Sequence, residues 1–486
     1  MLYHSIALPI LFFLDGIEED WIFGLSKNIK LMKKHFFSPI LLFSLIFFSN
    51  GIFAQMNLTW ADTLTKTLNQ CRIDESMQGL AGGVVFSDGS IWTAASGFHG
   101  TASLSDQFLY DIGSNTKSMI SAIILQLEDE GKLSIDDTLY QYISPIPMVS
   151  NGITLKQLLQ HRSGVYSYTN NPSFATAINN DPNKFWHPDS ILANFLNAPD
   201  FAPGGGFNYS NTGYVLLGKV IEVVDNRALN LALKARIFTP LGLDSIFLDQ
   251  YDPYTIVKTG AWLSPTNYFP TDFVSFMSSA WAAGAVVSTP KDFALYAHGL
   301  LSGQLVSSAS FVKMQQGSNI PGLGTYGLGI IKWNYNGKTY LGHGGTTLQN
   351  SEMEYSVDSD FSLVLMNIDQ GFSAETARAK RKFLDLLEYI EEEQANISLK
   401  EKSIASIGMD VYPNPAINSV NIDLELEDKN LELILEIRDM RGNLILKTPV
   451  ENQHLEIEKQ SLGTGLFVAS IFDKNNCLAR KRIIFY

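Results

Sequence analysis

The chain has 486 residues, of which 45% are hydrophobic and 17% charged, and its formal net charge is -14. This hydrophobic share is ample for a folded core and excludes a disordered chain, while the length predicts more than one domain. The acidic surplus gives no electrostatic footprint for nucleic acid or anionic lipid, so we expect neither as a partner.

The cysteine and histidine residues form no metal-binding pattern. Cys71 and Cys477 lie near opposite ends of the chain without CxxC or Cys/His spacing, so no disulfide framework is predicted, and a single bridge between them stays open. The histidines are isolated and no HExxH pair occurs, which gives no indication of zinc. We therefore expect no metal and no cofactor.

The first 54 residues are predicted to be absent from the mature protein. Residues 32–54 read MKKHFFSPILLFSLIFFSNGIFA, with two lysines, an apolar run and small residues ending at Ala54, which is the pattern of a cleaved secretory signal peptide. The apolar run is shorter than the about 20 residues of a transmembrane helix, so we expect no transmembrane anchor. Because signal peptides begin a chain, we infer that translation starts at Met32 and that residues 1–31 are an upstream misassignment. The protein is then secreted or displayed at the cell surface after export across the inner membrane.

Residues 55–395 are predicted to form one α/β domain. AGGVVFSDGSIWTAASG holds two β-rich runs around Asp88-Gly89, a hairpin pattern. In SNTKSMISAIILQLEDEGKL, apolar residues recur at three- and four-residue spacing until Gly131, which predicts a helix. STPKDFALYAHGLLSG has Pro290 behind a Ser/Thr cap and predicts another.

Strands return after these helices. YGLGIIKWNYNGKTYLGHGG places Asn336-Gly337 between two β-rich runs, and MEYSVDSDFSLVLMNI continues the pattern. Hairpins at both ends of the domain predict an antiparallel sheet whose first and last strands come from opposite ends of the sequence.

The spacing Ser-x-x-Lys occurs three times, at Ser114/Lys117, Ser288/Lys291 and Ser310/Lys313. On a helix these two positions share a face, so a lysine kept neutral can take the serine proton. We interpret Ser288 as a helix N-cap and Ser310 as part of a solvated helix face. Ser114 follows a glycine and opens the long apolar helix, where free N–H groups favour an oxyanion. We therefore predict Ser114 as nucleophile and Lys117 as its base.

The spacing Tyr-x-Asn also occurs three times, at Tyr168, Tyr209 and Tyr412. Tyr168 falls in a polar loop and Tyr412 in the C-terminal β-rich region. Tyr209 and Asn211 stand between the glycine loop PGGGF and the helical segment TGYVLLGKVIEVV. We predict that the Tyr209 phenol transfers a proton and that the Asn211 amide holds the substrate.

His343-Gly344-Gly345 ends the predicted strand KTYLGHGG, where glycines would let a substrate lie against the backbone. The three elements, in this order, resemble the serine β-lactamase and D-alanyl-D-alanine carboxypeptidase family, in its class C and small-peptidase branch. The resemblance covers most of residues 60–375. It implies an antiparallel five-stranded-type sheet flanked by helices, an all-helical subdomain, and hydrolysis through a serine acyl-enzyme.

Position by position, the resemblance implies that Ser114 is the nucleophile, Lys117 its base, and Tyr209 the proton donor to the leaving group. It implies that Asn211 and Gly345 contact the substrate and that the N–H groups of Ser114 and Thr346 form the oxyanion hole. His343 is implied as catalytic, at a position where other branches carry lysine. We expect His161 to brace the motif region and Trp281 to be either a pocket or a core aromatic.

One departure concerns the strand before His343. Carboxypeptidases of the family often carry an arginine there, which binds the substrate's terminal carboxylate, whereas this chain has Ile330, Ile331 and Lys332. The expected activity is D-alanyl-D-alanine carboxypeptidase-like hydrolysis of D-amino-acid peptides or amides, with peptidoglycan stem peptides as candidate substrates. A β-lactamase, a carboxylesterase, a D-amino-acid amidase and a non-catalytic surface-binding protein stay open as alternatives.

Residues 396–408 are predicted as a linker and residues 409–486 as a small all-β sandwich. VNIDLELE, LELILEIRD, GNLILKT and LFVASIFD alternate apolar and polar residues between turn signals. The opening VYPNPAINSV and the closing LGTGLFVASI resemble the C-terminal sorting domain of the type IX secretion system. The resemblance implies secretion machinery as a partner. A β-sandwich used for binding is the alternative.

Overall fold

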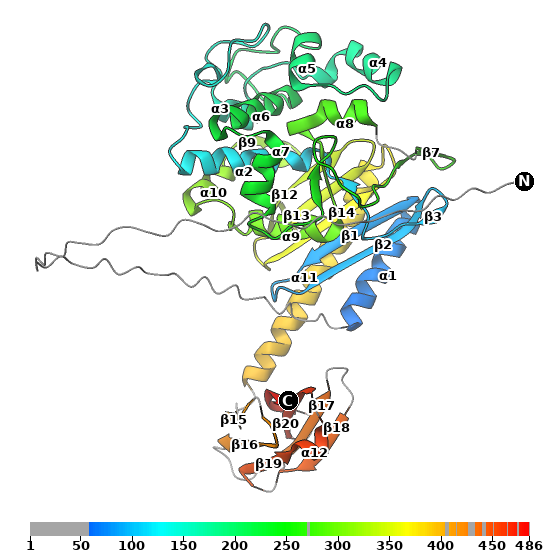
Figure 1. Ribbon diagram of the computed structural model, residues 1–486, viewed down its shortest axis with the longest axis vertical. Coiled ribbons are helices and arrows are strands. Elements are labelled where there is room, and N and C mark those ends of the chain that lie inside the picture. The colour runs from blue at the N-terminus through cyan, green and yellow to red at the C-terminus, as the bar shows by residue number, and fades with distance from the viewer. Residues whose placement is uncertain are drawn as a thin grey trace, which may run out of the picture. The chain divides into compact units, whose positions relative to one another are not determined.

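The computed structural model describes the backbone of residues 58–269, 273–403, 408–414, 416–425, 433–439, 444–450, 452–463, 465–473 and 476–485. The predicted signal peptide and the residues before it lie outside these ranges. Within them, no helix combines the length and the apolar character needed to cross a bilayer. Figure 1 shows a large α/β domain and a C-terminal β domain.

A nine-stranded antiparallel sheet forms the centre of the large domain. Its order is β3 (Ala102–Ser103), β2 (Ile91–His99), β1 (Gly79–Val85), β14 (Phe361–Asn367), β13 (Asn350–Ser356), β12 (Lys338–Thr346), β11 (Ile331–Tyr335), β10 (Gly324–Tyr326) and β9 (Ser318–Ile320). The first long strand, β1, pairs antiparallel with the last, β14. This confirms the prediction of an antiparallel sheet that joins strands from opposite ends of the domain sequence. Five neighbouring strands in this order have seven to nine residues and form the expected five-stranded core: β2, β1, β14, β13 and β12.

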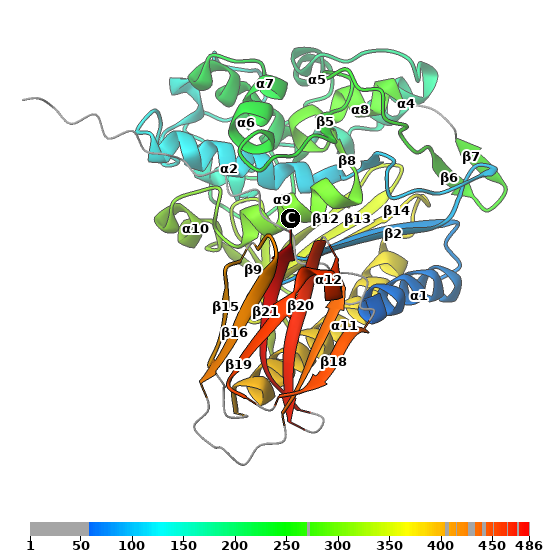
Figure 2. The same ribbon diagram turned by 60° about the horizontal axis from the view of Figure 1, so that its bottom comes forward.

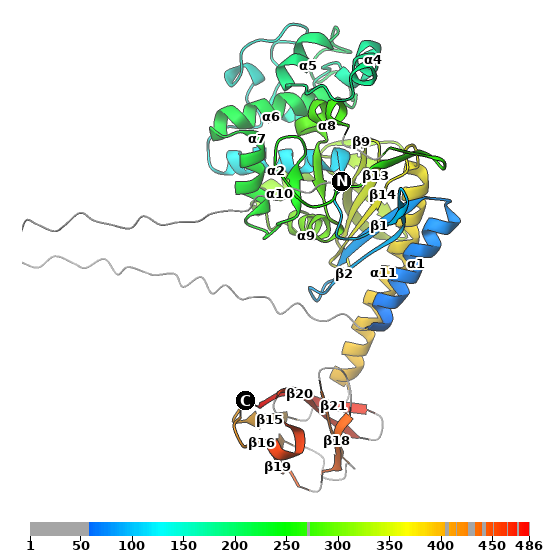
Figure 3. The same cartoon turned by 45° about the vertical axis from the view of Figure 1, so that its right-hand side comes forward.

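Helices cover both faces of this sheet, which explains why every residue of β1 and β14 is buried. On one face, α1 (Leu58–Asp74) and α11 (Ser373–Ser403) lie side by side, as Figure 3 shows. On the other face, α9 (Pro290–Leu301) packs on β1 and β14. A strand with no polar face is stable only between two such layers.

A mainly helical subdomain follows β4 (Tyr110–Asp111) and lies on the α9 side of the sheet (Figure 2). Its helices are α2 (Thr116–Asp129), α3 (Leu155–Leu159), α4 (Pro172–Asn180), α5 (Pro188–Asn194), α6 (Asn211–Asp225), α7 (Leu229–Leu233), α8 (Val274–Ala280) and α10 (Ser308–Met314). Its short strands are β5 (Ile246–Leu248), β6 (Ala261–Ser264), β7 (Asn267–Phe269) and β8 (Val286–Ser288). One hydrophobic core joins α2, α6 and α9.

Two local interpretations, those of Ser288 and Ser310, were wrong. The N-cap of α9 is Thr289, whose side chain accepts from the N–H of Asp292, because Ser288 is still part of β8. Ser310 is fully buried rather than solvated, and its hydroxyl donates to Asp129 at the end of α2, 2.7 Å away. Helix α11 runs through Ser403, so most of the predicted linker is helical. Trp281 is a core residue, with 2% of its surface exposed.

Helix α11 holds the outer layer in place through a stripe of fully buried residues: Phe383, Leu384, Leu387 and Ile390. We expect Phe383→Ala to lower the free energy of unfolding by about 3–5 kcal/mol, because it leaves a cavity against the sheet. Urea unfolding monitored by tryptophan fluorescence measures this change. Arg381→Ala, at an exposed position of the same helix, is the control. An equal effect of both changes would contradict this packing role.

The C-terminal domain consists of two antiparallel sheets around a core of its own. One contains β15 (Gly408–Tyr412), β16 (Ser419–Glu425) and β19 (His454–Glu458), and the other β18 (Leu444–Pro449), β17 (Leu433–Asp439), β20 (Gly465–Asp473) and β21 (Asn476–Phe485). A short helix, α12 (Lys459–Leu462), follows β19. The four predicted strands correspond to β16, β17, β18 and β20. Cys71 of the large domain is a buried free thiol, and the side chain of Cys477 lies outside the described residues.

Candidate active site

The Ser114 turn meets the end of β12 through two glycines. Gly113, in the turn η1 (Gly113–Asn115), has a φ of +52°, and a Cβ there would lie 2.8 Å from the Thr346 nitrogen. A Cβ on Gly345 would lie 2.1 Å from the Ile112 carbonyl oxygen. Side chains at either position would force the turn and the strand apart. The predicted serine and His-Gly-Gly elements are thus adjacent, and Thr346 lies beside the turn.

Ser114 and Lys117 form a hydrogen-bonded pair at the start of α2. The Lys117 Nζ lies 3.0 Å from the Ser114 Oγ and 2.5 Å from the Ala283 carbonyl oxygen. Ser114 is partly exposed, whereas Lys117 is completely buried. No carboxylate among the described residues pairs with this lysine, and burial lowers its pKa well below the usual range. A neutral amine facing a serine hydroxyl has the properties of a general base.

Tyr209 lies against this pair, on the loop before α6. The Lys117 Nζ is 4.9 Å from the centre of the Tyr209 ring. The Tyr209 hydroxyl is buried and makes no hydrogen bond of normal geometry to a described residue. Burial raises its pKa, and the nearby Ser114 hydroxyl offsets only part of that rise. The phenol therefore keeps its proton and can donate it.

The remaining predicted residues occupy different places around the serine. Asn211 and Thr346 line the cavity beside Ser114, and the Asn211 Nδ2 donates to Thr169 Oγ1, 3.1 Å away. His343 does not line that cavity. It lies behind Tyr209, with 6.4 Å between the ring centres, and burial lowers its pKa to about 4.

The cavity beside Ser114 has a volume of about 50 Å³. Its lining includes aromatic residues that sequence reasoning missed: Tyr168, Phe174 and Phe276. Tyr168, which the sequence placed in a polar loop, is buried, and its hydroxyl donates to the Ser279 carbonyl oxygen. None of the described residues that line this cavity is lysine or arginine.

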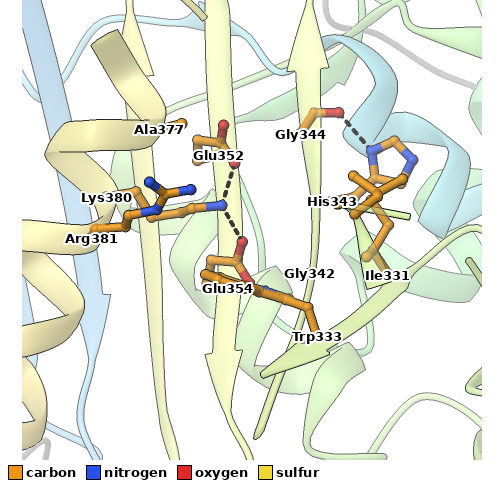
Figure 4. Close-up of a pocket in the computed structure, with 12 residues that line it drawn as sticks. Ile331, Trp333, Gly342, His343, Gly344, Glu352, Glu354, Ala377, Lys380 and Arg381 are labelled. Carbon is orange, nitrogen blue, oxygen red and sulfur yellow. Dashed lines mark hydrogen bonds and ion pairs between the residues drawn. The ribbon is translucent and has the colours of Figure 1, made fainter. Parts of the chain in front are cut away.

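A larger cavity, of about 240 Å³, lies between β11–β13 and α11 (Figure 4). Three of its charged groups pair with one another: Lys380 contacts Glu354 at 2.6 Å and Glu352 at 2.9 Å. Ile331 lines this cavity, and the exposed Lys332 lies 3.5 Å from the Gln315 side chain. Neither residue lines the Ser114 cavity, so neither offers a carboxylate-binding group there.

Comparison with known proteins identifies both domains. Residues 64–385 match the family described as Beta-lactamase. The chain belongs to the Beta-lactamase family. This match confirms the family and the fold expected from the motifs, and members of the family include serine hydrolases. Residues 410–485 of this Beta-lactamase-family chain match the Secretion system C-terminal sorting domain. This match confirms that the C-terminal region resembles the type IX sorting domain.

Curated relatives of this Beta-lactamase-family chain match only part of it. The putative penicillin-binding protein PbpX of Bacillus subtilis (strain 168) is 29% identical over 227 residues, which are 45% of this chain and 52% of the relative. Protein flp of Staphylococcus aureus (strain NCTC 8325 / PS 47) is 31% identical over 168 residues, which are 34% of this chain and 28% of flp. The chain thus spans about half, or less, of these relatives.

Solved structures match the large domain more completely. A D-stereospecific amidohydrolase from Streptomyces sp. superposes with a TM-score of 0.58 at 28% identity, over 66% of this chain and 98% of that one. The D-amino acid amidase from Ochrobactrum anthropi SV3 superposes with a TM-score of 0.59 at 22% identity, over 68% and 99%. The second similarity shows the fold alone.

Proposed function

We propose that the protein is an exported serine hydrolase that cleaves amides of D-amino acids through an acyl-enzyme on Ser114. The observation that carries this proposal is the Ser114–Lys117 pair, in which a buried lysine faces a partly exposed serine at 3.0 Å. The similarity to a D-stereospecific amidohydrolase supports the substrate class.

The proposed reaction has two steps. In the first, neutral Lys117 takes the Ser114 proton while Oγ forms a bond to the substrate carbonyl carbon, and the N–H groups of Ser114 and Thr346 bind the oxyanion. As the C–N bond breaks, Tyr209 gives its proton to the leaving nitrogen and regains one from Lys117. In the second step, water attacks the ester, and the reverse proton transfers release the acid and restore Ser114.

The lining of the Ser114 cavity favours substrates with an uncharged leaving group. A carboxypeptidase binds the carboxylate next to the scissile bond, and a buried carboxylate needs a cation or several donors. The described lining residues supply aromatic rings, hydroxyls and the Asn211 amide, with no cation. Amides and esters meet this environment without that electrostatic cost, whereas peptidoglycan stem peptides with a free terminus do not.

We expect kcat/KM for D-phenylalanine amide to exceed that for D-alanyl-D-alanine peptides by at least about 10-fold, because the free carboxylate finds no partner. Release of ammonia or D-alanine by the full chain measures this ratio, with Ser114→Ala as the inactive control. A preference for D-alanyl-D-alanine, with durable labelling by a fluorescent penicillin, would indicate a carboxypeptidase instead. Fast turnover of that penicillin would indicate a β-lactamase. A preference for p-nitrophenyl esters would indicate an esterase, and no turnover of any substrate a binding protein.

We also propose that residues 32–54 direct export across the inner membrane and that residues 409–486 deliver the protein through type IX secretion. The match of residues 410–485 to a secretion sorting domain supports the second step. Substrates would then be met outside the cell or on its surface.

A further inference from the structure

Three buried side chains form a hydrogen-bonded row behind Tyr209. His161 comes from the loop after α3, Tyr326 ends β10, and His343 lies on β12. The Tyr326 hydroxyl is 2.9 Å from His161 Nε2 and 3.1 Å from His343 Nε2. Both ends of the row are backbone groups. The Ser210 nitrogen lies 3.0 Å from His161 Nδ1, and the Gly344 oxygen lies 2.6 Å from His343 Nδ1.

These backbone ends determine where every proton in the row resides. An amide N–H only donates, so His161 Nδ1 is an acceptor and the neutral ring carries its proton on Nε2. A carbonyl oxygen only accepts, so His343 carries its proton on Nδ1 and its Nε2 is an acceptor. Tyr326 must therefore accept from His161 and donate to His343. Burial lowers the pKa of His161 well below its usual range and that of His343 to about 4, which keeps both rings neutral.

The row joins two parts of the catalytic machinery. Ser210 is the residue after Tyr209, and Gly344 lies two residues before Thr346. The Tyr209 ring stacks against His161 with 4.0 Å between ring centres, and meets Tyr326 edge-on at 6.2 Å. The neighbouring Tyr214 hydroxyl donates to the Leu159 carbonyl oxygen at 2.9 Å.

We propose that Tyr326 is a positioning residue of the Ser114 site, which holds the Tyr209 segment against β12 and fixes His343 as a neutral Nδ1–H tautomer. This inference rests on the proposed function. With both ring nitrogens engaged, His343 has no atom left for the substrate proton. Its role is to support β12, and proton transfer belongs to Lys117 and Tyr209. This replaces the catalytic role that the family resemblance implied for His343.

The tautomers provide a test that does not depend on turnover. In the full chain labelled with ¹⁵N-histidine at pH 7, long-range ¹H–¹⁵N spectra distinguish protonated from unprotonated ring nitrogens, and His161→Gln and His343→Gln assign the signals. We expect opposite tautomers, with the proton on Nε2 in His161 and on Nδ1 in His343. The same tautomer in both rings, or a charged His343, would overturn the proposal even in an active enzyme. If the expected tautomers were found in a protein without amidase activity, the hydrogen-bonded row would stand and only the proposed function would be rejected.

Kinetics then test the positioning role. Tyr326→Phe keeps the ring but removes the hydroxyl that both histidines need. We expect kcat for the best amide to fall about 10- to 100-fold with KM within about threefold, because Tyr209 loses its orientation. Tyr340→Phe is the matched control: this buried tyrosine donates to Glu388, in contact with α11 rather than the Ser114 site, and we expect an unchanged kcat. An unchanged kcat in Tyr326→Phe, or a rise in KM alone, would contradict the positioning role of Tyr326.

Discussion

Replacing Lys117 with methionine is expected to lower kcat/KM by about 1,000-fold or more and to leave the protein folded. Methionine fills the same buried space but has no lone pair to take the Ser114 proton. Because the change removes a completely buried amine that has no carboxylate partner among the residues the structure describes, the melting temperature should stay the same or rise. Amide hydrolysis measures the first effect and thermal unfolding the second.

The chain supplies a matched control for this change. Lys291 has the same Ser-x-x-Lys spacing but is exposed on α9, so Lys291→Met should leave kcat/KM unchanged. The double variant Ser114→Ala with Lys117→Met should be no worse than either single one, because the two residues act as a unit. Additive losses, or substantial acyl-enzyme formation in Lys117→Met by intact-protein mass spectrometry, would show that another group activates Ser114.

The pH dependence of the wild type follows from the same residue. Lys117 must be unprotonated to act as a base, so kcat/KM should rise with pH as the lysine loses its proton. Since burial lowers its pKa well below 10.5, the enzyme should reach its plateau far below that pH. A kcat/KM that rises only as the pH approaches 10.5 would contradict a buried, neutral Lys117 acting as the base.

The sequence predicted those parts of the site that depend on local spacing. Ser114 and Lys117 are one helical turn apart, so a helix alone brings them together. Ser310 has the same spacing, and its burial against Asp129 depends on how α10 packs on α2, which no local pattern encodes.

The parts of the site that the sequence did not predict depend on long-range packing. Tyr168, Phe174 and Phe276 reach one cavity from separate segments of the helical subdomain. Tyr326 reaches His343 because β10, β11 and β12 are neighbours in the sheet. The motif located His343 at a strand end, but its role depends on a partner that only the pairing of these strands reveals.

The second large effect is expected at Lys258, which is buried between two carboxylates. Its Nζ is 3.2 Å from Asp111 and also pairs with Asp249, and all three side chains are at most 8% exposed. Burial alone would lower the pKa of Lys258, but Asp111 and Asp249 more than offset this and keep it charged. Asp111 also accepts from the Thr347 hydroxyl at 2.9 Å. The cluster therefore joins the strand before Ser114 to the segment after β12.

We expect Lys258→Met to lower the free energy of unfolding by about 3–5 kcal/mol at pH 7, because it leaves two buried carboxylates without their cation. Urea unfolding at several pH values measures this loss. Lys66→Met is the control, since Lys66 pairs with Asp62 on the surface and such pairs contribute little.

The pH dependence of this loss has a definite sign. Burial raises the pKa of the Asp111 carboxyl and Lys258 opposes that rise, so without Lys258 its pKa in the folded state lies further above that in the unfolded state. The folded state then binds more protons, so the variant loses stability as pH rises through those values and regains it as pH falls. The difference from wild type should be largest at neutral pH and should shrink toward pH 4. A difference that grows toward acid pH would mean that the folded variant keeps these carboxylates charged and compensated by other groups.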